Sequence, residues 1–162
     1  MDSEIKNKLL ACTKATAPLF TLEGTTTPAK LYQFYDCDSF YMSIVLKGAL
    51  TSFKCRLLGI DSAELRSKDA VEKKLAYEAR DRMREIADNS VCMVSCSSFD
   101  KYGRVLVSVV LPNGEDLATK ILDEKLAFSY DGTRKYTQWC ELRESRDIYL
   151  KTQGARMQRV SS

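Results

Sequence analysis

The sequence predicts an α+β domain in which a small closed barrel of five β-strands is packed by about three α-helices. Two observations lead to this prediction. Five short segments rich in aromatic and β-branched residues are separated by turn residues, and other segments space their apolar residues three or four positions apart. The chain has 162 residues, which suits one domain with its own hydrophobic core.

The N-terminal part is expected to be an extension over residues 1–27, followed by the domain at 28–162. The extension contains a short helical pattern at Ile5 and Leu9, then Pro18 and a polar GTTTP stretch that interrupts regular structure. The next three apolar segments are residues 31–36, 39–47 and 51–60. Since turn residues separate them, we expect three consecutive antiparallel strands.

The period of the apolar residues then changes, which predicts an amphipathic helix over residues 71–88. Its buried face would carry Val71, Leu75, Ala79, Met83 and Ile86 or Ala87, with charged residues between them. Ser67 lies just upstream and is expected to cap this helix.

Two further strands are predicted at residues 90–99 and 104–111, followed by two helices. Leu117, Ile121 and Leu122 indicate a short helix, and a last helix over 136–151 is expected to bury Trp139, Leu142 and Tyr149 or Leu150. Five antiparallel strands with open edges would pair with other chains, so we expect a closed, OB-like barrel.

Composition excludes several classes of chemistry. The chain has no histidine, which removes Ser-His-Asp and Cys-His hydrolases and every histidine-ligated zinc site. Six cysteines are present, and we expect free thiols. Cys92 and Cys96 fall on one predicted strand, roughly 13 Å apart, which is too far for a disulfide or one shared zinc ion.

Charge and hydropathy bear on location and partners. The first twenty residues lack a secretory signal and no 18-residue apolar run occurs, so we expect a soluble, intracellular protein with no membrane partner, and a monomer. Residues 134–159 carry seven Lys or Arg residues against three acidic residues. This basic stretch indicates either an anionic partner or a solvated helix face.

A group of polar residues falls where the predicted strands end. The group comprises Asp36, Asp38, Arg56, Asp61, Ser62, Glu64, Lys101, Tyr102 and Arg104. Each residue alone has a structural interpretation, because aspartates and serines commonly cap turns. Together they suit phosphodiester hydrolysis, which needs a cation, donors to the phosphate oxygens and an acceptor for the proton of water.

The chemical types point to a role for each kind of residue. Two aspartates and a backbone carbonyl are hard oxygen ligands that suit Ca²⁺ or Mg²⁺. Two arginines present planar donors that match phosphate. Since histidine is absent, Glu64 is the candidate for general base or for positioning the water.

Three motifs resemble the signatures of the staphylococcal nuclease-like, or thermonuclease, family. They are RLLGIDSAE at residues 56–64, DKYGR at 100–104 and DCDS at 36–39, in the order and about the spacing of the family. The segments VEKKLAYEARDRM and EKLAFSYDG also resemble it, so the similarity covers roughly residues 29–151.

The resemblance implies a role for nine residues. The calcium ligands would be Asp38, Asp61 and the carbonyl of Ser62; the phosphate-binding arginines would be Arg56 and Arg104; the general base would be Glu64. Lys101 and Tyr102 would contact the terminal phosphate, and Tyr130 would line the base pocket. The implied activity is Ca²⁺-dependent hydrolysis of DNA and RNA that leaves 3′-phosphate ends. A shallow site of this kind favours single-stranded or melted substrates.

Some features depart from the family pattern. Cys37 stands where the family has glycine, and a positive φ there would cost about 1 to 2 kcal/mol. Ser39 replaces threonine and Ala63 replaces proline. Arg56 and Asp61 are an odd number of residues apart, so a bend near Gly59 is needed to bring them to one side.

Two other functions remain open from the sequence. One is a catalytically silent nuclease-like module that binds nucleic acid or protein. The other is a plain OB-type single-strand binder, which would carry aromatic residues on its binding face and would not need Glu64 beside two aspartates.

Overall fold

A closed five-stranded barrel forms the centre of the protein, which is described here by a computed structural model covering residues 2–133 and 136–160. The barrel strands are β1 (Thr26–Asp36), β2 (Ser39–Leu46), β3 (Ala49–Leu57), β5 (Val91–Phe99) and β6 (Val105–Val110). They pair in the order β1-β2-β3-β6-β5, and β5 pairs with β1 to close the barrel. The predicted α+β, OB-like fold class is confirmed.

The strand directions differ from the all-antiparallel expectation at one place. β3 and β6 are parallel, with Cys55 opposite Val105 and Leu57 opposite Val107, while the other four pairs are antiparallel. The reason is one of parity: directions cannot alternate all the way around a closed ring with an odd number of strands. One parallel pair is therefore required once five strands close.

The strands alternate between the barrel interior and the outside, as their sequences predict. Along β2 every second residue from Phe40 to Ile44 is buried, and Val105, Val107 and Val109 of β6 are all buried. Burial of such apolar side chains stabilises the fold by roughly 1.5 to 3 kcal/mol each.

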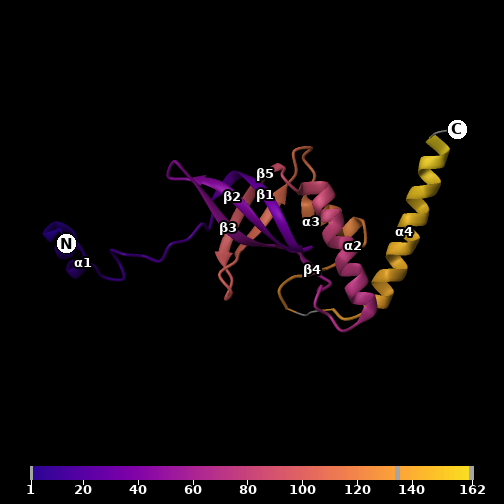
Figure 1. Cartoon of the computed structure of the whole chain (residues 1–162), viewed down its shortest axis with the longest axis horizontal. Helices are drawn as coiled ribbons and strands as arrows, with labels where there is room; N and C mark the ends of the chain where they lie inside the picture. Colours follow the sequence, from indigo (N-terminus) through magenta and orange to yellow (C-terminus); the bar gives the residue numbers. More distant parts are fainter. Residues whose placement is uncertain (1, 134–135, 161–162) are drawn as a thin grey trace.

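The described residues form four helices: α1 (Ser3–Ala11), α2 (Ala70–Ala87), α3 (Leu117–Asp123) and α4 (Trp139–Val160). α1 buries no residue and lies apart from the barrel at the N-terminal end, whereas α2 lies between the barrel and α4 (Figure 1). Among the described residues no helix is long and apolar enough to cross a membrane.

Helix α2 forms where predicted but has a different cap. Its buried face carries Leu75, Ala79 and Met83, as the periodicity indicated. Asp69, and not Ser67, is the N-cap residue, and its carboxylate accepts hydrogen bonds from the main-chain N–H groups of the first turn. Ser67 instead donates a hydrogen bond to a side chain of that turn.

The predicted third strand, residues 51–60, is divided in two. β3 ends at Leu57, a turn follows at residues 58–59, and β4 (Ile60–Ser62) begins a separate two-stranded sheet with β7 (Ala127–Ser129). Strand β7 was not predicted from the sequence, because three residues are too few to show an alternation of apolar and polar side chains.

The segment before the barrel also joins the core. β1 begins at Thr26, Leu22 is buried in the barrel core, and the ring of Phe20 stacks at 6.3 Å on that of Phe53. A contact with Phe99, also at 6.3 Å between ring centres, ties this segment to β5 as well.

Helix α4 begins later and runs farther than the predicted 136–151. Trp139 and Leu142 are buried as expected, but Leu150 is exposed and Tyr149 is half-buried, so that part of the prediction is wrong. The reason is that α4 diverges from α2 along its length, so that its last half points away from α2 and from the barrel (Figure 1). All six cysteines are free, as predicted, and four of them are buried.

The basic residues of 134–159 divide into two groups. Arg143 pairs with Glu78 and Asp147, and Arg146 is buried against the C-terminal end of α3, so both arginines join helices together. Other members of the stretch, Lys151, Arg156 and Arg159, are exposed, and Arg134 and Lys135 lie outside the described residues.

Candidate active site

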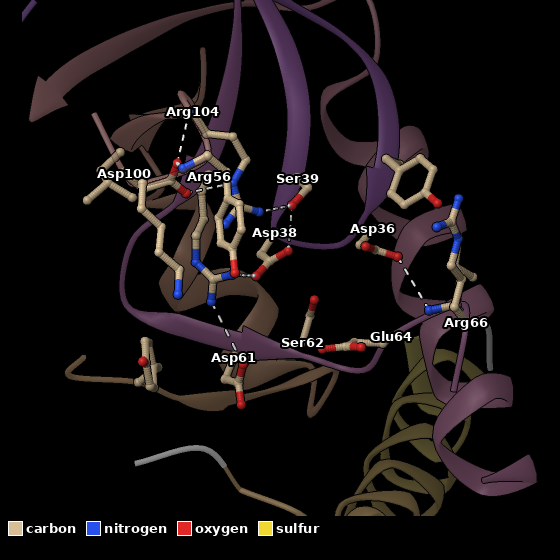
Figure 2. Close-up of a pocket in the computed structure, with 16 residues that line it drawn as sticks. Asp36, Asp38, Ser39, Arg56, Asp61, Ser62, Glu64, Arg66, Asp100 and Arg104 are labelled. Atoms are coloured by element: carbon tan, nitrogen blue, oxygen red, sulfur yellow. Dashed lines mark hydrogen bonds and ion pairs between the residues drawn. The ribbon is translucent and has the colours of Figure 1, made fainter. Parts of the chain in front are cut away.

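A pocket of about 550 Å³ opens where the β1–β2 turn, β3, β4 and its following loop, and the β5–β6 turn meet (Figure 2). All nine residues that the resemblance singled out line it: Asp38, Arg56, Asp61, Ser62, Glu64, Lys101, Tyr102, Arg104 and Tyr130. Residues from five separate segments of the chain are therefore brought together.

Arg56 lies between Asp38 and Asp61, two of the aspartates that line this pocket. Its Nη1 atom is 2.9 Å from Oδ2 of Asp38, and its Nη2 atom is 3.8 Å from Oδ1 of Asp61. Both aspartates are buried, whereas burying a carboxylate without a partner would be costly. The arginine thus compensates for the two negative charges.

The bend at Gly59 makes this arrangement possible. Gly59 has φ +85°, a conformation that costs glycine little and other residues more. It ends β3 and lets β4 start with a new alternation, so that Asp61 faces Arg56 despite the odd spacing. The bend that the spacing required is present.

The turn that carries Asp38 holds Cys37 without the strain considered above. Among the described residues, Cys37 is not one of those with positive φ, so the replacement of glycine has no backbone penalty. Its side chain is fully buried, and burial, together with the charges of Asp38 and Asp36, raises the pKa of the thiol well above its ordinary value. Cys37 is therefore a neutral core residue.

Arg104 is held in place by Asp100 and Ser39. Oδ2 of Asp100 accepts a 2.7 Å hydrogen bond from Nε of Arg104, and Oγ of Ser39 accepts one of 3.0 Å from its Nη1. Ser39 in turn donates to Oδ1 of Asp38 at 3.0 Å. A continuous chain of hydrogen bonds and ion pairs therefore links Arg104 with Asp38 and Arg56.

Asp100, which was not among the residues selected from the sequence, fixes the turn that carries Tyr102 and Arg104. Its Oδ1 atom accepts hydrogen bonds from the main-chain N–H groups of Tyr102 and Arg104, at 2.8 and 2.9 Å. Burial alone would raise the pKa of this carboxyl group, but these hydrogen bonds and that from the Arg104 guanidinium lower it. An aspartate two residues before a turn N–H was the signal available in the sequence.

Glu64 lies on the loop after β4, which is fixed by the first turn of α2. Oε1 of Glu72 accepts a 3.1 Å hydrogen bond from the main-chain N–H of Glu64, and its Oε2 atom accepts one of 2.5 Å from Ser67. Ala63 is fully buried beside the α2–α4 contact. These contacts hold the loop in place around Ala63.

Aromatic rings accompany the cations on one side of the pocket. The Nζ atom of Lys101 and the Cζ atom of Arg104 lie 5.0 and 5.6 Å from the centre of the Tyr102 ring, which is 70% exposed. Cζ of Arg56 lies 5.8 Å from the centre of the Tyr130 ring. Exposed rings beside cations can stack on a base while the cation contacts phosphate.

The pocket also contains Asp36, which the sequence placed among the polar residues at the strand ends, and three residues that were not predicted from the sequence: Tyr35, Leu65 and Arg66. Burial raises the pKa of Asp36, and the charges of Asp38 and Glu64 act in the same direction, against the Leu65 N–H and Arg66. Five carboxylates, those of Asp36, Asp38, Asp61, Glu64 and Asp100, therefore share this pocket with its cations.

The donor atoms match a hard divalent cation in chemical type. Asp38 and Asp61 supply carboxylate oxygens, and the Oγ atom of Ser62 is buried with no hydrogen-bond partner among the described residues. However, within residues 2–133 and 136–160 no three His, Cys, Asp or Glu side chains are placed to share one ion. A set of two carboxylates and one carbonyl would have only two such side chains.

The barrel and this charged pocket define a nuclease-type, OB-like domain. A comparison with protein families matches residues 54–161, or 108 of the 162 residues, to the staphylococcal nuclease homologues. The chain therefore belongs to the staphylococcal nuclease homologue family. No curated protein sequence matches the chain significantly. Asp38 lies before the matched range, and the structure brings it to Arg56 and Asp61.

Proposed function

We propose that the protein is a Ca²⁺-dependent nuclease that hydrolyses phosphodiester bonds of DNA and RNA and leaves 3′-phosphate ends. The observation that carries the proposal is the pocket itself, which gathers two arginines, two buried aspartates and Glu64 around one open space. Family membership supports a nuclease-type activity.

Arg56 and Arg104 would bind the phosphate to be cleaved. Each guanidinium has five N–H donors, and the ion pairs with Asp38 and Asp100 occupy part of them. The remaining donors can bond the non-bridging oxygens, whose negative charge grows as water attacks. The aspartates keep both guanidinium groups in a fixed orientation, so little reorganisation accompanies the reaction.

Glu64 would accept the proton of the attacking water. Water adds to phosphorus, its proton passes to the Glu64 carboxylate, and the bond from phosphorus to the 5′ oxygen breaks. The 5′ oxygen leaves as a hydroxyl group after taking a proton from solvent, and the phosphate stays on the 3′ oxygen. A carboxylate suits this role because the chain has no histidine.

Asp38, Asp61 and the carbonyl of Ser62 would hold the metal ion. The three oxygens are of the type that Ca²⁺ prefers, and the unpartnered hydroxyl of Ser62 leaves polar capacity at the same place. A bound Ca²⁺ would supply positive charge at the phosphoryl group.

A catalytically silent nuclease-like module is the second candidate. The contact of Arg56 with both Asp38 and Asp61 favours it, because an ion bound to these carboxylates would have to share them with the guanidinium. Such a module would bind nucleic acid in the same pocket without cleaving it.

One experiment separates the two candidates. The purified protein is incubated with heat-denatured DNA in Ca²⁺, in Mg²⁺, in Zn²⁺ or in excess chelator, and the ends of the products are identified. We expect cleavage with Ca²⁺, little support from Zn²⁺, and 3′-phosphate products. Full activity in chelator would overturn the metal assignment, and binding without cleavage in every condition would favour the silent module.

Substrate form gives a second test of the proposal. The open pocket reaches an unpaired strand more easily than a stiff duplex, and water attack needs no 2′-hydroxyl. Initial rates on matched single-stranded DNA, duplex DNA and single-stranded RNA should therefore be highest for single strands, with RNA accepted. Faster cutting of intact duplex would contradict the shallow site.

A further inference from the structure

The end of the pocket opposite Arg104 carries a cation–aromatic pair that the proposed reaction does not use. Cζ of Arg66 lies 5.9 Å from the centre of the Tyr35 ring, and both residues line the pocket. Figure 2 shows Arg66 and Asp36 on one side, Arg104 and Asp100 on the other, and Asp38, Ser62 and Glu64 between them.

Two separate segments build this pair and are joined by one hydrogen bond. Tyr35 belongs to the end of β1, and Arg66 to the loop after β4. The main-chain N–H of Leu65, next to Arg66, donates to Oδ1 of Asp36, next to Tyr35, at 3.4 Å. The fold therefore places the ring and the guanidinium side by side.

Both groups of the pair are available to a ligand. Tyr35 is 52% exposed and Arg66 is exposed. Arg66 forms no ion pair within 4.0 Å among residues 2–133 and 136–160, whereas Arg56 and Arg104 each pair with an aspartate. Its charge acts to lower the pKa of Asp36, but the two side chains form no ion pair within that distance, so the N–H donors of Arg66 can also contact a ligand in the pocket.

We propose that Tyr35 and Arg66 form a nucleotide-binding subsite for the unpaired nucleotide on the other side of the cleaved bond from Tyr102 and Tyr130. The base stacks on the Tyr35 ring, and the Arg66 guanidinium contacts the next phosphate of the strand. This inference rests on the proposed function, because it takes the centre of the pocket as the place of cleavage.

The consequence is a strand path with a cation–aromatic pair at each end. Lys101 and Tyr102 hold one side, Arg56 and Arg104 hold the phosphate between, and Tyr35 and Arg66 hold the other side. A strand that crosses the pocket in this way contacts protein on both sides of the bond that breaks.

The kinetic test uses a dinucleotide, which has one cleavable bond, and two versions of it in which one or the other base is removed. We expect Tyr35→Ala to raise KM about tenfold on the intact dinucleotide and on one of these versions. On the dinucleotide that lacks the base expected to stack on Tyr35, the Tyr35→Ala substitution should have little further effect on KM. Equal losses on all three substrates would overturn the subsite and would place Tyr35 among the supports of the Glu64 loop.

The binding test uses single-stranded oligonucleotide and Glu64→Gln protein, so that no cleavage is required. Arg66→Ala should weaken binding and reduce the slope of log affinity against log salt by about 0.7, the value for one phosphate contact on a single strand. Tyr77→Ala and Arg80→Ala are the matched controls, since they remove a cation–aromatic pair of 4.9 Å that lies outside the pocket. These controls should leave affinity and slope unchanged.

The two tests distinguish failure of the subsite from failure of the proposed function. A protein that cleaves nothing but loses affinity through Arg66→Ala and Tyr35→Ala refutes the nuclease proposal and supports the subsite. An unchanged affinity and salt slope in both variants overturns the subsite, whether or not the protein cleaves.

Discussion

Two parts of the molecule use arginine–carboxylate pairs for different ends. At the candidate active site, Arg56 and Arg104 pair with aspartates on one side and border an open pocket on the other. Between α2 and the end of α3, the carboxylate of Glu124 accepts hydrogen bonds of 2.8 and 2.9 Å from Arg82. Neither Glu124 nor Arg82 lines that pocket, so the space around the guanidinium decides whether it can also bind a ligand.

Glu124 is the centre of the second set of arginine–carboxylate pairs, which does not line the pocket of the candidate active site and is called the closed network below. It is 5% exposed, its hydrogen bonds raise the pKa of Arg82, and its main-chain oxygen accepts a 2.7 Å hydrogen bond from Nη1 of Arg146. One residue at the end of α3 thereby joins α2 and α4. The pocket arginines hold loops in place with the same chemistry but retain donors for phosphate.

The largest expected effect is on stability, at the closed network. Glu124→Ala removes the buried carboxylate that Arg82 and Arg146 share, leaving Arg82 with its exposed partner Glu85 and Arg146 with the main-chain oxygen of residue 124, so the free energy of unfolding in urea should fall by about 3 to 5 kcal/mol. Glu85→Ala is the matched control, because Glu85 also pairs with Arg82 but is exposed, and it should cost less than about 1 kcal/mol. Equal losses would show that burial does not distinguish the two partners.

Arg56→Lys and Arg104→Lys test the arginine–aspartate pairs that border the pocket. Each keeps a positive charge but loses the planar pair of donors, so kcat/KM should fall by the equivalent of about 2 to 4 kcal/mol of transition-state stabilisation. Arg82→Lys is the control in the closed network, and its effect should be on melting temperature, with activity per folded molecule retained. Parallel losses of melting temperature and activity at Arg56 or Arg104 would make these arginines structural.

Glu64→Gln keeps the shape of the side chain and removes the proton acceptor. Turnover should fall by at least about 10², equivalent to about 2.7 kcal/mol, while affinity for single-stranded DNA survives. Glu144→Gln, a change of the same type at an exposed position of α4, should alter neither quantity. Unchanged turnover at Glu64 would mean that another group accepts the proton.

The smallest effect concerns pH and Asp100. Because the folded protein lowers the pKa of this carboxyl group below its ordinary 3.8, its ionised form stabilises the fold, fully so above that value. The contribution is lost as pH falls through the folded pKa. The free energy of unfolding of Asp100→Asn should therefore depend less on pH below about pH 4 than that of the unchanged protein. Parallel curves for the two proteins would contradict the assignment.

Much of the architecture could be predicted because local patterns and packing agree. The two periods of apolar residues placed all five barrel strands and α2, since each pattern matches the face that the fold buries. The end of α4 and the strand β7 could not be predicted. Leu150 has the spacing of a buried residue, and the place where the partner surface ends is a tertiary property.

The residues of the pocket could be selected from their chemical types and motifs, but their connections could not. Motif spacing does not show that Ser39 bridges Arg104 and Asp38, or that Tyr35 and Arg66 meet. Those contacts join Tyr35 at the end of β1 and Ser39 at the start of β2 to residues about thirty or more positions away along the chain, and only the folded barrel with its loops brings them together.

The hydrogen bond by which Glu72 fixes the loop after β4 also affects how that loop moves. Since the carboxylate of Glu72 accepts a hydrogen bond from the main-chain N–H of Glu64, this amide proton can exchange with solvent only when the hydrogen bond opens. Glu72 belongs to the first turn of α2, where helices fray most readily, so we expect the exchange rate of the Glu64 amide to follow that fraying and not the much slower opening of the barrel. The rate at which the loop beside the pocket opens would then be set by fraying of the first turn of α2.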